Sequence, residues 1–374
     1  MNQVRRCAAP WRGLHITPQG DLKTCCSGAN IIGNINSEDI RSLLSKPILS
    51  EIRNTIKNGD LHPEYCAICI QSERGGTSER NWHNNINPDL DFDSDTHSPT
   101  LIDIRWNTTC NLACNYCGPF ASSRWESRMQ VKPLTRARNF LPEITDYVSQ
   151  HRNQLKEVGL VGGEPLLLNE NLKLLEIVPE HAVVTVITNC NVDFVSNQIV
   201  KQLLKRQRVG WSMSFDNVGE RMEYVRHGAN WPLTDQNVRT IVKHFEQGHW
   251  GGIHAVYSIF NCTRLRDLRQ YANDVGIDIV WQVLVNPWEL DPCQHSLALR
   301  DLALEEIEQY KQEFGLTDLE REFFTKIEKQ LQVSATNQNA SAELKKRIYK
   351  IEHNWHDDAM PNFDTLWPEI AQIL

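Results

Sequence analysis

Three cysteines in the segment Cys110-Asn-Leu-Ala-Cys114-Asn-Tyr-Cys117 constrain this chain most, because they form a CxxxCxxC pattern directly after an apolar strand candidate. Three thiolates on one short loop can hold three irons of a cubane [4Fe–4S] cluster and leave the fourth iron without a protein ligand, whereas electron-transfer clusters take four cysteines. Zinc is the alternative, but structural zinc takes four ligands and CxxC pairs usually come in twos. The pattern favours a cluster with one open iron and leaves zinc as the rival.

The number and distribution of the cysteines also argue for metal rather than disulfides. The chain has 11 cysteines in 374 residues, and an odd number cannot be fully paired. The first residues, MNQVRRCAAPW, lack the apolar run of a signal peptide, so we expect a cytoplasmic protein with reduced thiols. A net charge of −8 gives no general attraction to nucleic acid or to an anionic membrane.

The middle of the chain alternates short apolar strands with helical segments, which predicts an α/β fold with parallel strands, arranged as a partial (β/α)6 barrel. We expect three regions: a cysteine-rich module and linker over 1–98, this core over 99–295, and a helical region over 296–374. In such folds chemistry gathers at the carboxyl ends of the strands. The expected strands are Leu101–Trp106, Glu157–Val161, Val183–Thr188, Gly210–Phe215, Ile253–Phe260 and Asp278–Val285.

From Leu101 to Pro292 the sequence resembles the radical S-adenosylmethionine (SAM) superfamily. The resemblance implies that Cys110, Cys114 and Cys117 hold the catalytic cluster and that SAM chelates its open iron. Tyr116 stands at the family's aromatic position near adenine. The GGEP sequence formed by Gly162, Gly163, Glu164 and Pro165 follows the second strand, where the family contacts the methionine amino group. Glycine permits close backbone approach, and a carboxylate suits an ammonium group.

Looser matches extend the resemblance to the later strand ends. Ser212, Ser214 and Asp216 end the fourth strand like the family's ribose-contacting segment, and hydroxyl and carboxylate groups suit a diol. Arg226 corresponds to an arginine that binds the SAM carboxylate, and Asn189 to a polar contact at a strand end. Each residue alone has a simpler interpretation, such as a turn or a helix cap. Their order at successive strand ends favours the family interpretation.

The amino-terminal cysteines follow a second pattern: Cys7, twelve residues, Gly20, four residues and Cys25, then Cys66-Ala-Ile-Cys69. This resembles the twitch domain, a shortened relative of the SPASM domain, which implies that the four cysteines hold an auxiliary [4Fe–4S] cluster. The module precedes the core here, whereas it usually follows it. Cys26 makes the second ligand ambiguous by one position. Four cysteines also suit zinc, and Glu73 and Arg80 are expected to be ordinary solvated residues under either interpretation.

The resemblance implies an enzyme with two [4Fe–4S] clusters that reductively cleaves SAM to a 5′-deoxyadenosyl radical and removes hydrogen from a substrate. We expect a peptide or amino-acid-type substrate, with a sugar, nucleotide or other small molecule as the alternative, and a reductant such as flavodoxin or ferredoxin as partner. A non-enzymatic zinc-binding protein and a radical SAM fold without turnover are the other classes considered. Cys190, Cys262 and Cys293 are interpreted as buried packing residues rather than hydrogen donors.

Overall fold

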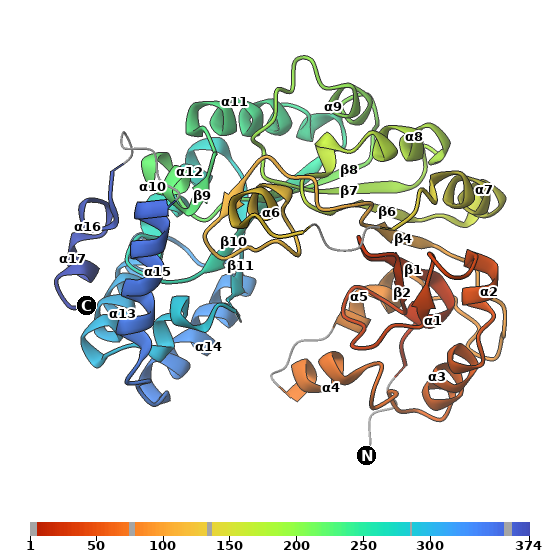
Figure 1. Cartoon of the computed structure of the whole chain (residues 1–374), viewed down its shortest axis with the longest axis horizontal. Coiled ribbons are helices and arrows are strands. Elements are labelled where there is room, and N and C mark those ends of the chain that lie inside the picture. The colour runs from red at the N-terminus through yellow and green to blue at the C-terminus, as the bar shows by residue number, and fades with distance from the viewer. Residues whose placement is uncertain (1–5, 75–78, 133–136, 285, 355–360) are drawn as a thin grey trace. The chain divides into compact units, whose positions relative to one another are not determined.

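The computed structural model describes residues 6–74, 79–132, 137–284, 286–354 and 361–374. The chain divides into two compact units (Figure 1). The first unit comprises Met1–Thr109, Lys132–Ile187 and Val195–Gly210. The second comprises Cys110–Val131, Thr188–Phe194 and Trp211–Leu374.

The first unit is built on a sheet in which the strands follow the order β7-β6-β4-β1-β2-β3. Strands β1, β4, β6 and β7 are parallel, whereas β2 and β3 extend the sheet in antiparallel fashion. The strands are β1 (Gly13–Ile16), β2 (Asp21–Lys23), β3 (Gly33–Asn34), β4 (Leu101–Ile104), β6 (Glu157–Leu160) and β7 (Val183–Thr188).

One face of this sheet forms the core of the first unit, because alternate strand residues point to the same side. The residues on this face are at most 1% exposed, and burying each such side chain contributes roughly 1.5–3 kcal/mol. They are Leu14, Ile16, Ile102, Ile104, Val158, Leu160, Val184 and Val186. Helices α7 and α8 lie beside these strands (Figure 1).

The helices of the first unit connect and cover the strands. Helix α3 (Pro47–Lys57) buries Leu49, Ile52 and Ile56, and Gly59 follows its end with a φ of 90°. This left-handed backbone favours glycine. The other helices are α1 (Ala9–Arg12), α2 (Ile40–Leu44), α4 (Ala67–Arg74), α5 (Glu79–Ile86), α7 (Leu141–His151), α8 (Asn169–Ile177) and α9 (Gln198–Leu203), with 3-10 turns η1 (Arg152–Gln154) and η2 (Pro165–Leu167).

The amino-terminal hairpin joins the same sheet as the core strands. Leu14 of β1 pairs in parallel register with Ile102 of β4. Gly20 turns the chain between β1 and β2 with a φ of 87°, and a Cβ there would lie 2.8 Å from the Ile35 side chain. The glycine between Cys7 and Cys25 is therefore required by backbone conformation and by close packing.

In the second unit the strands follow the order β11-β10-β8, and β10 and β11 are parallel. These strands are β8 (Val209–Ser214), β10 (Trp250–Tyr257) and β11 (Asp278–Val283); a two-stranded sheet pairs β5 (Ala113–Cys114) with β9 (Arg226–His227). The helices are α6 (Ser123–Met129), α10 (Gly219–Val225), α11 (Trp231–Val242), α12 (Leu265–Val275), α13 (Leu297–Glu313), α14 (Asp318–Val333), α15 (Ala340–Asn354), α16 (Phe363–Leu366) and α17 (Pro368–Ala371), with 3-10 turns η3 (Phe245–Gln247), η4 (Trp288–Leu290) and η5 (Pro292–Gln294).

The six predicted strands are present as β4, β6, β7, β8, β10 and β11, which confirms the predicted α/β class with parallel strands separated by helices. The carboxy-terminal region is helical from α13 onward, also as predicted. Val285, the last residue of the sixth predicted strand, lies outside the described residues. Among the described helices, none has the length and apolar character needed to cross a membrane.

Two buried histidines of the first unit make its stability depend on pH. Burial lowers the pKa of His83 to about 4 and that of His97 to about 4. Each histidine therefore binds fewer protons in the folded than in the unfolded chain between pH 4 and its ordinary pKa of about 6.5. We expect the free energy of unfolding to fall as pH drops through this window, by up to roughly 3 kcal/mol for each histidine.

Denaturant titrations of the reconstituted protein at pH 7 and pH 5 measure this effect. The His83→Leu and His97→Leu variants should each show a smaller difference between the two pH values than the unaltered protein. A free energy of unfolding that is the same at both pH values in the unaltered protein would contradict the prediction.

Candidate iron–sulfur centres

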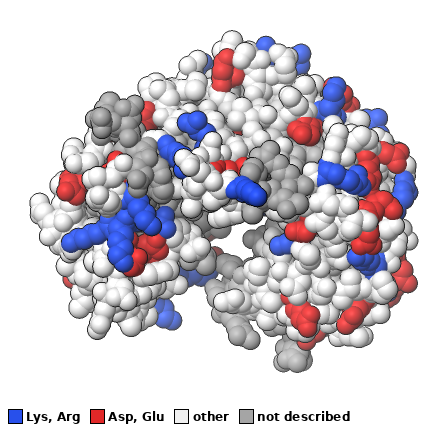
Figure 2. Space-filling model, in the orientation of Figure 1, with Lys and Arg blue, Asp and Glu red and all other residues white. Residues whose placement is uncertain are grey.

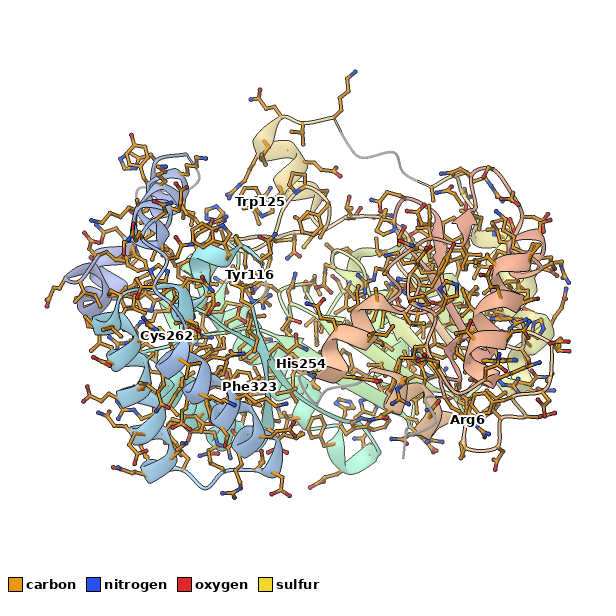
Figure 3. The ribbon with its side chains drawn as sticks, turned by 90° about the horizontal axis from the view of Figure 1, so that it is seen from below. Arg6, Tyr116, Trp125, His254, Cys262 and Phe323 are labelled. Atoms are coloured by element: carbon orange, nitrogen blue, oxygen red, sulfur yellow. The ribbon has the colours of Figure 1, made fainter. Side chains whose placement is uncertain are left out.

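The CxxxCxxC loop follows β4 and is held by hydrogen bonds within the second unit. The Cys110 amide donates to the Ser123 hydroxyl at 3.1 Å, and the Cys117 amide donates to the Cys114 carbonyl at 2.9 Å. The Trp125 indole also donates to the Cys114 carbonyl, at 3.0 Å. Figure 3 labels Trp125 and Tyr116, which belong to this part of the chain. The three thiols are thus presented on one ordered loop.

A buried ion pair between Asp216 and Arg226 contacts the cysteine loop. Asp216 is 1% exposed and accepts hydrogen bonds from the Tyr116 hydroxyl at 2.5 Å, Arg226 Nε at 3.0 Å and the Val256 amide at 2.7 Å. Burial opposes the charge of Arg226, but Asp216, Tyr116 and Cys114 raise the pKa of its guanidinium above the ordinary value. Arg226 therefore stays a cation.

This cation lies beside one of the thiols. Arg226 Nη1 is 3.9 Å from Cys114 Sγ, and the guanidinium lies 5.4 Å from the centre of the Tyr116 ring. Burial raises the pKa of Cys114 to about 12, and Arg226 acts in the opposite direction. A thiolate at Cys114 is compensated by this neighbour. The donor set thus suits a metal cluster that takes its ligands as thiolates.

Asn189, the predicted polar contact after β7, joins the same loop. Its amide nitrogen donates to Asn111 Oδ1 at 2.9 Å and lies 4.0 Å from Cys110 Sγ. Ser212 and Ser214 lie at the carboxyl end of β8, just before Asp216; Ser212 is buried and Ser214 half-buried. The second unit thus brings the three cysteines, Tyr116, Asn189, Asp216 and Arg226 into one network of contacts.

The GGEP segment follows β6 in the first unit. Gly162 has a φ of 138°, and a Cβ on Gly163 would lie 2.3 Å from the Thr109 carbonyl oxygen. The Glu164 amide donates to that carbonyl at 2.8 Å, and Glu164 Oε1 accepts from the Leu166 amide at 3.2 Å. Pro165 begins η2. Gly163 is therefore needed where this loop meets the residues directly before Cys110.

The amino-terminal cysteines gather in the first unit. Burial raises the pKa of Cys7 to about 12, and the neighbouring Cys66 and Cys69 raise it further. Burial also raises the pKa of Cys25, with added contributions from Cys7, Cys26 and Cys69. Cys26 is exposed. Among the described residues, no three His, Cys, Asp or Glu side chains lie close enough together to hold a single metal ion.

The prediction that Glu73 and Arg80 are ordinary solvated residues is wrong. Their side chains form an ion pair and are only 13% and 15% exposed. Arg80 lowers the pKa of Cys7, and Glu73 raises that of Cys66, so both lie near the amino-terminal thiols. No local sequence pattern marks this ion pair, because its two residues lie on different helices, α4 and α5.

Cys190, Cys262 and Cys293 are buried, as expected for packing residues. Burial raises the pKa of Cys262 above its ordinary value and that of Cys293 to about 12. Figure 3 shows Cys262 inside the second unit. Neutral buried thiols behave as small apolar side chains, which supports the packing interpretation.

Two family models match the chain. Residues 7–70 match the SPASM iron–sulfur cluster-binding domain, and residues 103–217 match a 4Fe-4S single cluster domain. The first range contains all four predicted auxiliary ligands, and the second contains the CxxxCxxC loop and the GGEP segment. These matches confirm the predicted resemblance: this is an iron–sulfur protein with a SPASM-type domain ahead of a single-cluster domain.

Several solved structures are similar to the chain at low identity. Streptococcus suis SuiB bound to the precursor peptide SuiA is 16% identical, with a TM-score of 0.41, over 58% of this chain and 47% of SuiB. Native anSMEcpe with bound AdoMet is 18% identical, with a TM-score of 0.40, over 54% of this chain and 57% of that chain. The chain therefore spans about half the length of these proteins. No curated protein matches it.

Proposed function

We propose that this chain is a radical SAM enzyme whose catalytic cluster is held by Cys110, Cys114 and Cys117. The observation that carries the proposal is the ordered three-thiol loop with the Arg226 guanidinium 3.9 Å from Cys114 Sγ. When bound, a cluster with one open iron supplies the electron that splits SAM into methionine and a 5′-deoxyadenosyl radical, which removes hydrogen from a substrate. The four cysteines of the amino-terminal pattern, Cys7, Cys25, Cys66 and Cys69, would hold an auxiliary cluster.

The chain's own residues position SAM and protect the chemistry. Tyr116 is held by its hydrogen bond to Asp216, which fixes its ring beside the loop. Asn189 holds Asn111, the residue directly after Cys110. Ser212 and Ser214 offer hydroxyl groups at the end of β8 for the SAM ribose. Arg226 and Asp216 neutralise one another in a buried site beside the cysteine loop. They therefore hold this loop in place, in addition to any contact that they make with SAM.

For the substrate we propose a peptide or an amino-acid-type molecule. Support comes from the SPASM-type domain, because relatives with such modules include peptide-modifying maturases. A sugar, nucleotide or other small molecule is the alternative. The auxiliary cluster, with Arg80 and Glu73 beside its thiols, would accept or supply the electron that the net reaction requires.

Anaerobic reconstitution tests the proposal as a whole. We expect about eight irons per chain, four for each cluster, and 5′-deoxyadenosine after reduction in the presence of SAM. Zinc without iron or sulfide would instead identify a zinc-binding protein. Two clusters without any deoxyadenosine would identify a radical SAM fold that does not turn over.

Glu164→Gln should weaken SAM binding and leave the iron content unchanged. The carboxylate is the predicted partner of the SAM ammonium group, and a hydrogen bond to a charged group contributes about 1.5–3 kcal/mol, so affinity should fall roughly ten- to a hundredfold. Gln keeps an oxygen that can accept from the Leu166 amide, as Glu164 does at 3.2 Å.

Equilibrium binding of SAM to the reconstituted proteins measures this change. Glu170→Gln, in the first turn of the neighbouring helix α8, is the matched control and should bind SAM normally. Equal SAM affinity in the Glu164→Gln variant and the unaltered protein would place Glu164 outside the site.

The basic face of α15 is the proposed docking site for the reductant. Figure 2 shows lysine and arginine gathered over this helix, which carries Lys345, Lys346, Arg347 and Lys350. Arg347 donates to the carbonyl of Asn115, between Cys114 and Tyr116, at 2.9 Å. The whole chain has a net charge of −8, so it does not attract an acidic electron carrier in general. The lysines of α15 would attract such a carrier locally, at a helix that contacts the cluster loop.

Replacing Lys345, Lys346 and Lys350 together by Glu should slow reduction by flavodoxin roughly tenfold or more at low salt. Reduction by dithionite, which needs no docking surface, should be unchanged. Anaerobic stopped-flow absorbance of the clusters measures both rates without requiring SAM cleavage. If both reductants act on the variant as they do on the unaltered protein, the docking site lies elsewhere.

A further inference from the structure

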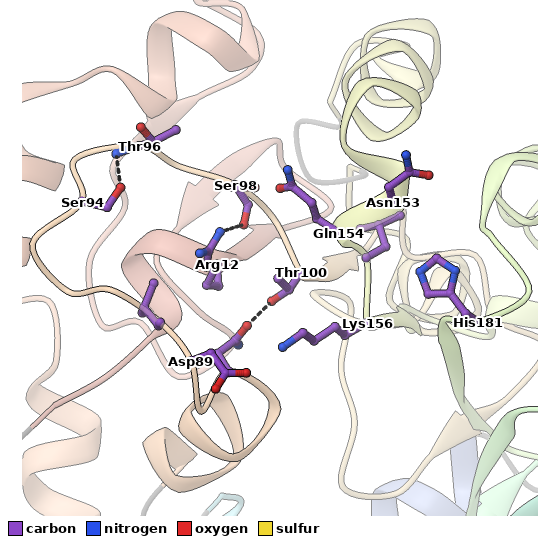
Figure 4. Close-up of a pocket in the computed structure, with 13 residues that line it drawn as sticks. Arg12, Asp89, Ser94, Thr96, Ser98, Thr100, Asn153, Gln154, Lys156 and His181 are labelled. Atoms are coloured by element: carbon purple, nitrogen blue, oxygen red, sulfur yellow. Dashed lines mark hydrogen bonds between the residues drawn. The ribbon is translucent and has the colours of Figure 1, made fainter.

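A pocket of about 610 Å³ lies in the first unit at the amino-terminal edge of the parallel strands (Figure 4). Gly13, Leu101, Glu157 and Val183 share one register row across β1, β4, β6 and β7. The residues that precede this row therefore lie along the edge, and Arg12, Thr100, Lys156 and His181 all line the pocket. The cysteine loop and the GGEP segment follow β4 and β6 instead, at the opposite ends of these strands.

The cations of this pocket have carbonyl partners but no carboxylate partners. Arg12 Nη1 donates to the Ser98 carbonyl at 3.1 Å, and Lys156 Nζ donates to the Ile86 carbonyl at 2.6 Å. Neither side chain forms an ion pair with a carboxylate in the described part of the chain. Asp89 is the acidic residue among the described lining residues. Arg12, which is half-buried, and Lys156, which is exposed, thus share the pocket with one carboxylate, that of Asp89.

A buried hydroxyl in the pocket wall also lacks a partner. Ser98 is 8% exposed, and its Oγ has no hydrogen-bond partner among the described residues. Nearby, the Thr100 hydroxyl donates to Asn87 Oδ1 at 2.8 Å, so that hydroxyl is satisfied within the wall. Buried polar groups without partners are rare in folded proteins because leaving them unpaired costs free energy. Ser98 Oγ is itself enclosed by the wall, so it is a polar group that the described part of the fold leaves without a partner beside the pocket.

We propose that this pocket binds a small organic oxyanion, a molecule that carries carboxylate or phosphate groups. Arg12 and Lys156 pair with its charges. The volume admits a molecule larger than a single ion, and the amides of Asn153 and Gln154 line the remaining wall. The pocket shares no residue with the proposed SAM site and does not depend on the proposed radical chemistry.

Binding is tested with the reconstituted full chain in the absence of SAM. Inorganic phosphate and succinate are the two probes, with sodium chloride at the same ionic strength as the control. We expect saturable binding by calorimetry and a rise in melting temperature for at least one probe. Phosphate alone would identify a phosphate ester, and succinate alone a carboxylate ligand, as the occupant class. Failure of both probes to bind saturably overturns the proposal.

Two variants locate the binding. Arg12→Gln and Lys156→Gln should each weaken it roughly tenfold or more, because each removes a charged hydrogen bond. Lys201→Gln, an exposed lysine on α9, is the matched control and should bind normally. Unchanged affinity in both Arg12→Gln and Lys156→Gln would place the anion outside this pocket.

Discussion

Replacing Cys110, Cys114 and Cys117 together by alanine is expected to lower the iron content from about eight to about four per chain and to abolish SAM cleavage. The three thiols supply every protein ligand of the proposed catalytic cluster, and no other described cysteine lies in their loop. Iron and sulfide analysis and deoxyadenosine formation after reduction measure the two effects. Formation of deoxyadenosine at the normal rate by the triple variant would show that the catalytic cluster lies elsewhere.

The amino-terminal cysteines provide the reciprocal experiment. Cys7→Ala combined with Cys69→Ala should also remove about four irons, but should leave SAM cleavage in place. Cys26→Ala is the matched control, because its exposed side chain adjoins Cys25 without sharing its burial, and it should retain about eight irons. If Cys26→Ala loses iron and Cys25→Ala retains it, Cys26 rather than Cys25 is the second ligand of the auxiliary cluster.

The fold was predictable where the signal is local. The six strands of the core are apolar runs of strand length bounded by turns, and all six are present. The parallel pairing of β1 with β4 was not predicted, because Leu14 and Ile102 are joined by a contact between distant parts of the sequence. Neither spacing nor periodicity within a segment marks its pairing with a distant strand, so this pairing could not be predicted from local patterns.

The candidate site was predictable in its residues but less so in their partners. Cysteine spacing located both groups of thiols, since cluster ligation needs particular residues close together in the chain. The resemblance also implied separate contacts with SAM, from Asp216 to the ribose and from Arg226 to the carboxylate. The structure shows them paired with each other at 3.0 Å, a relation between side chains that no spacing rule predicts. Their contacts with SAM stay predictions.

Asp216→Ala should lower the free energy of unfolding by about 3–5 kcal/mol, because it leaves the Arg226 guanidinium buried without its counter-charge. Arg226 and Asp216 side chains are only 8% and 1% exposed, so water cannot replace the lost partner without rearrangement. The Tyr116 hydroxyl and the Val256 amide lose their acceptor as well. Denaturant titration of the reconstituted protein measures the change.

The double variant Asp216→Ala, Arg226→Met separates charge from packing. It removes both charges and should be less destabilised than Asp216→Ala alone, because the isolated cation rather than the missing contact accounts for most of the loss. Glu322→Ala, which breaks the exposed ion pair with Lys326 on α14, is the control and should change stability by less than about 1 kcal/mol. Equal loss of stability in the single and double variants would mean that Asp216 stabilises the cysteine loop by packing and hydrogen bonding, and that its charge contributes little.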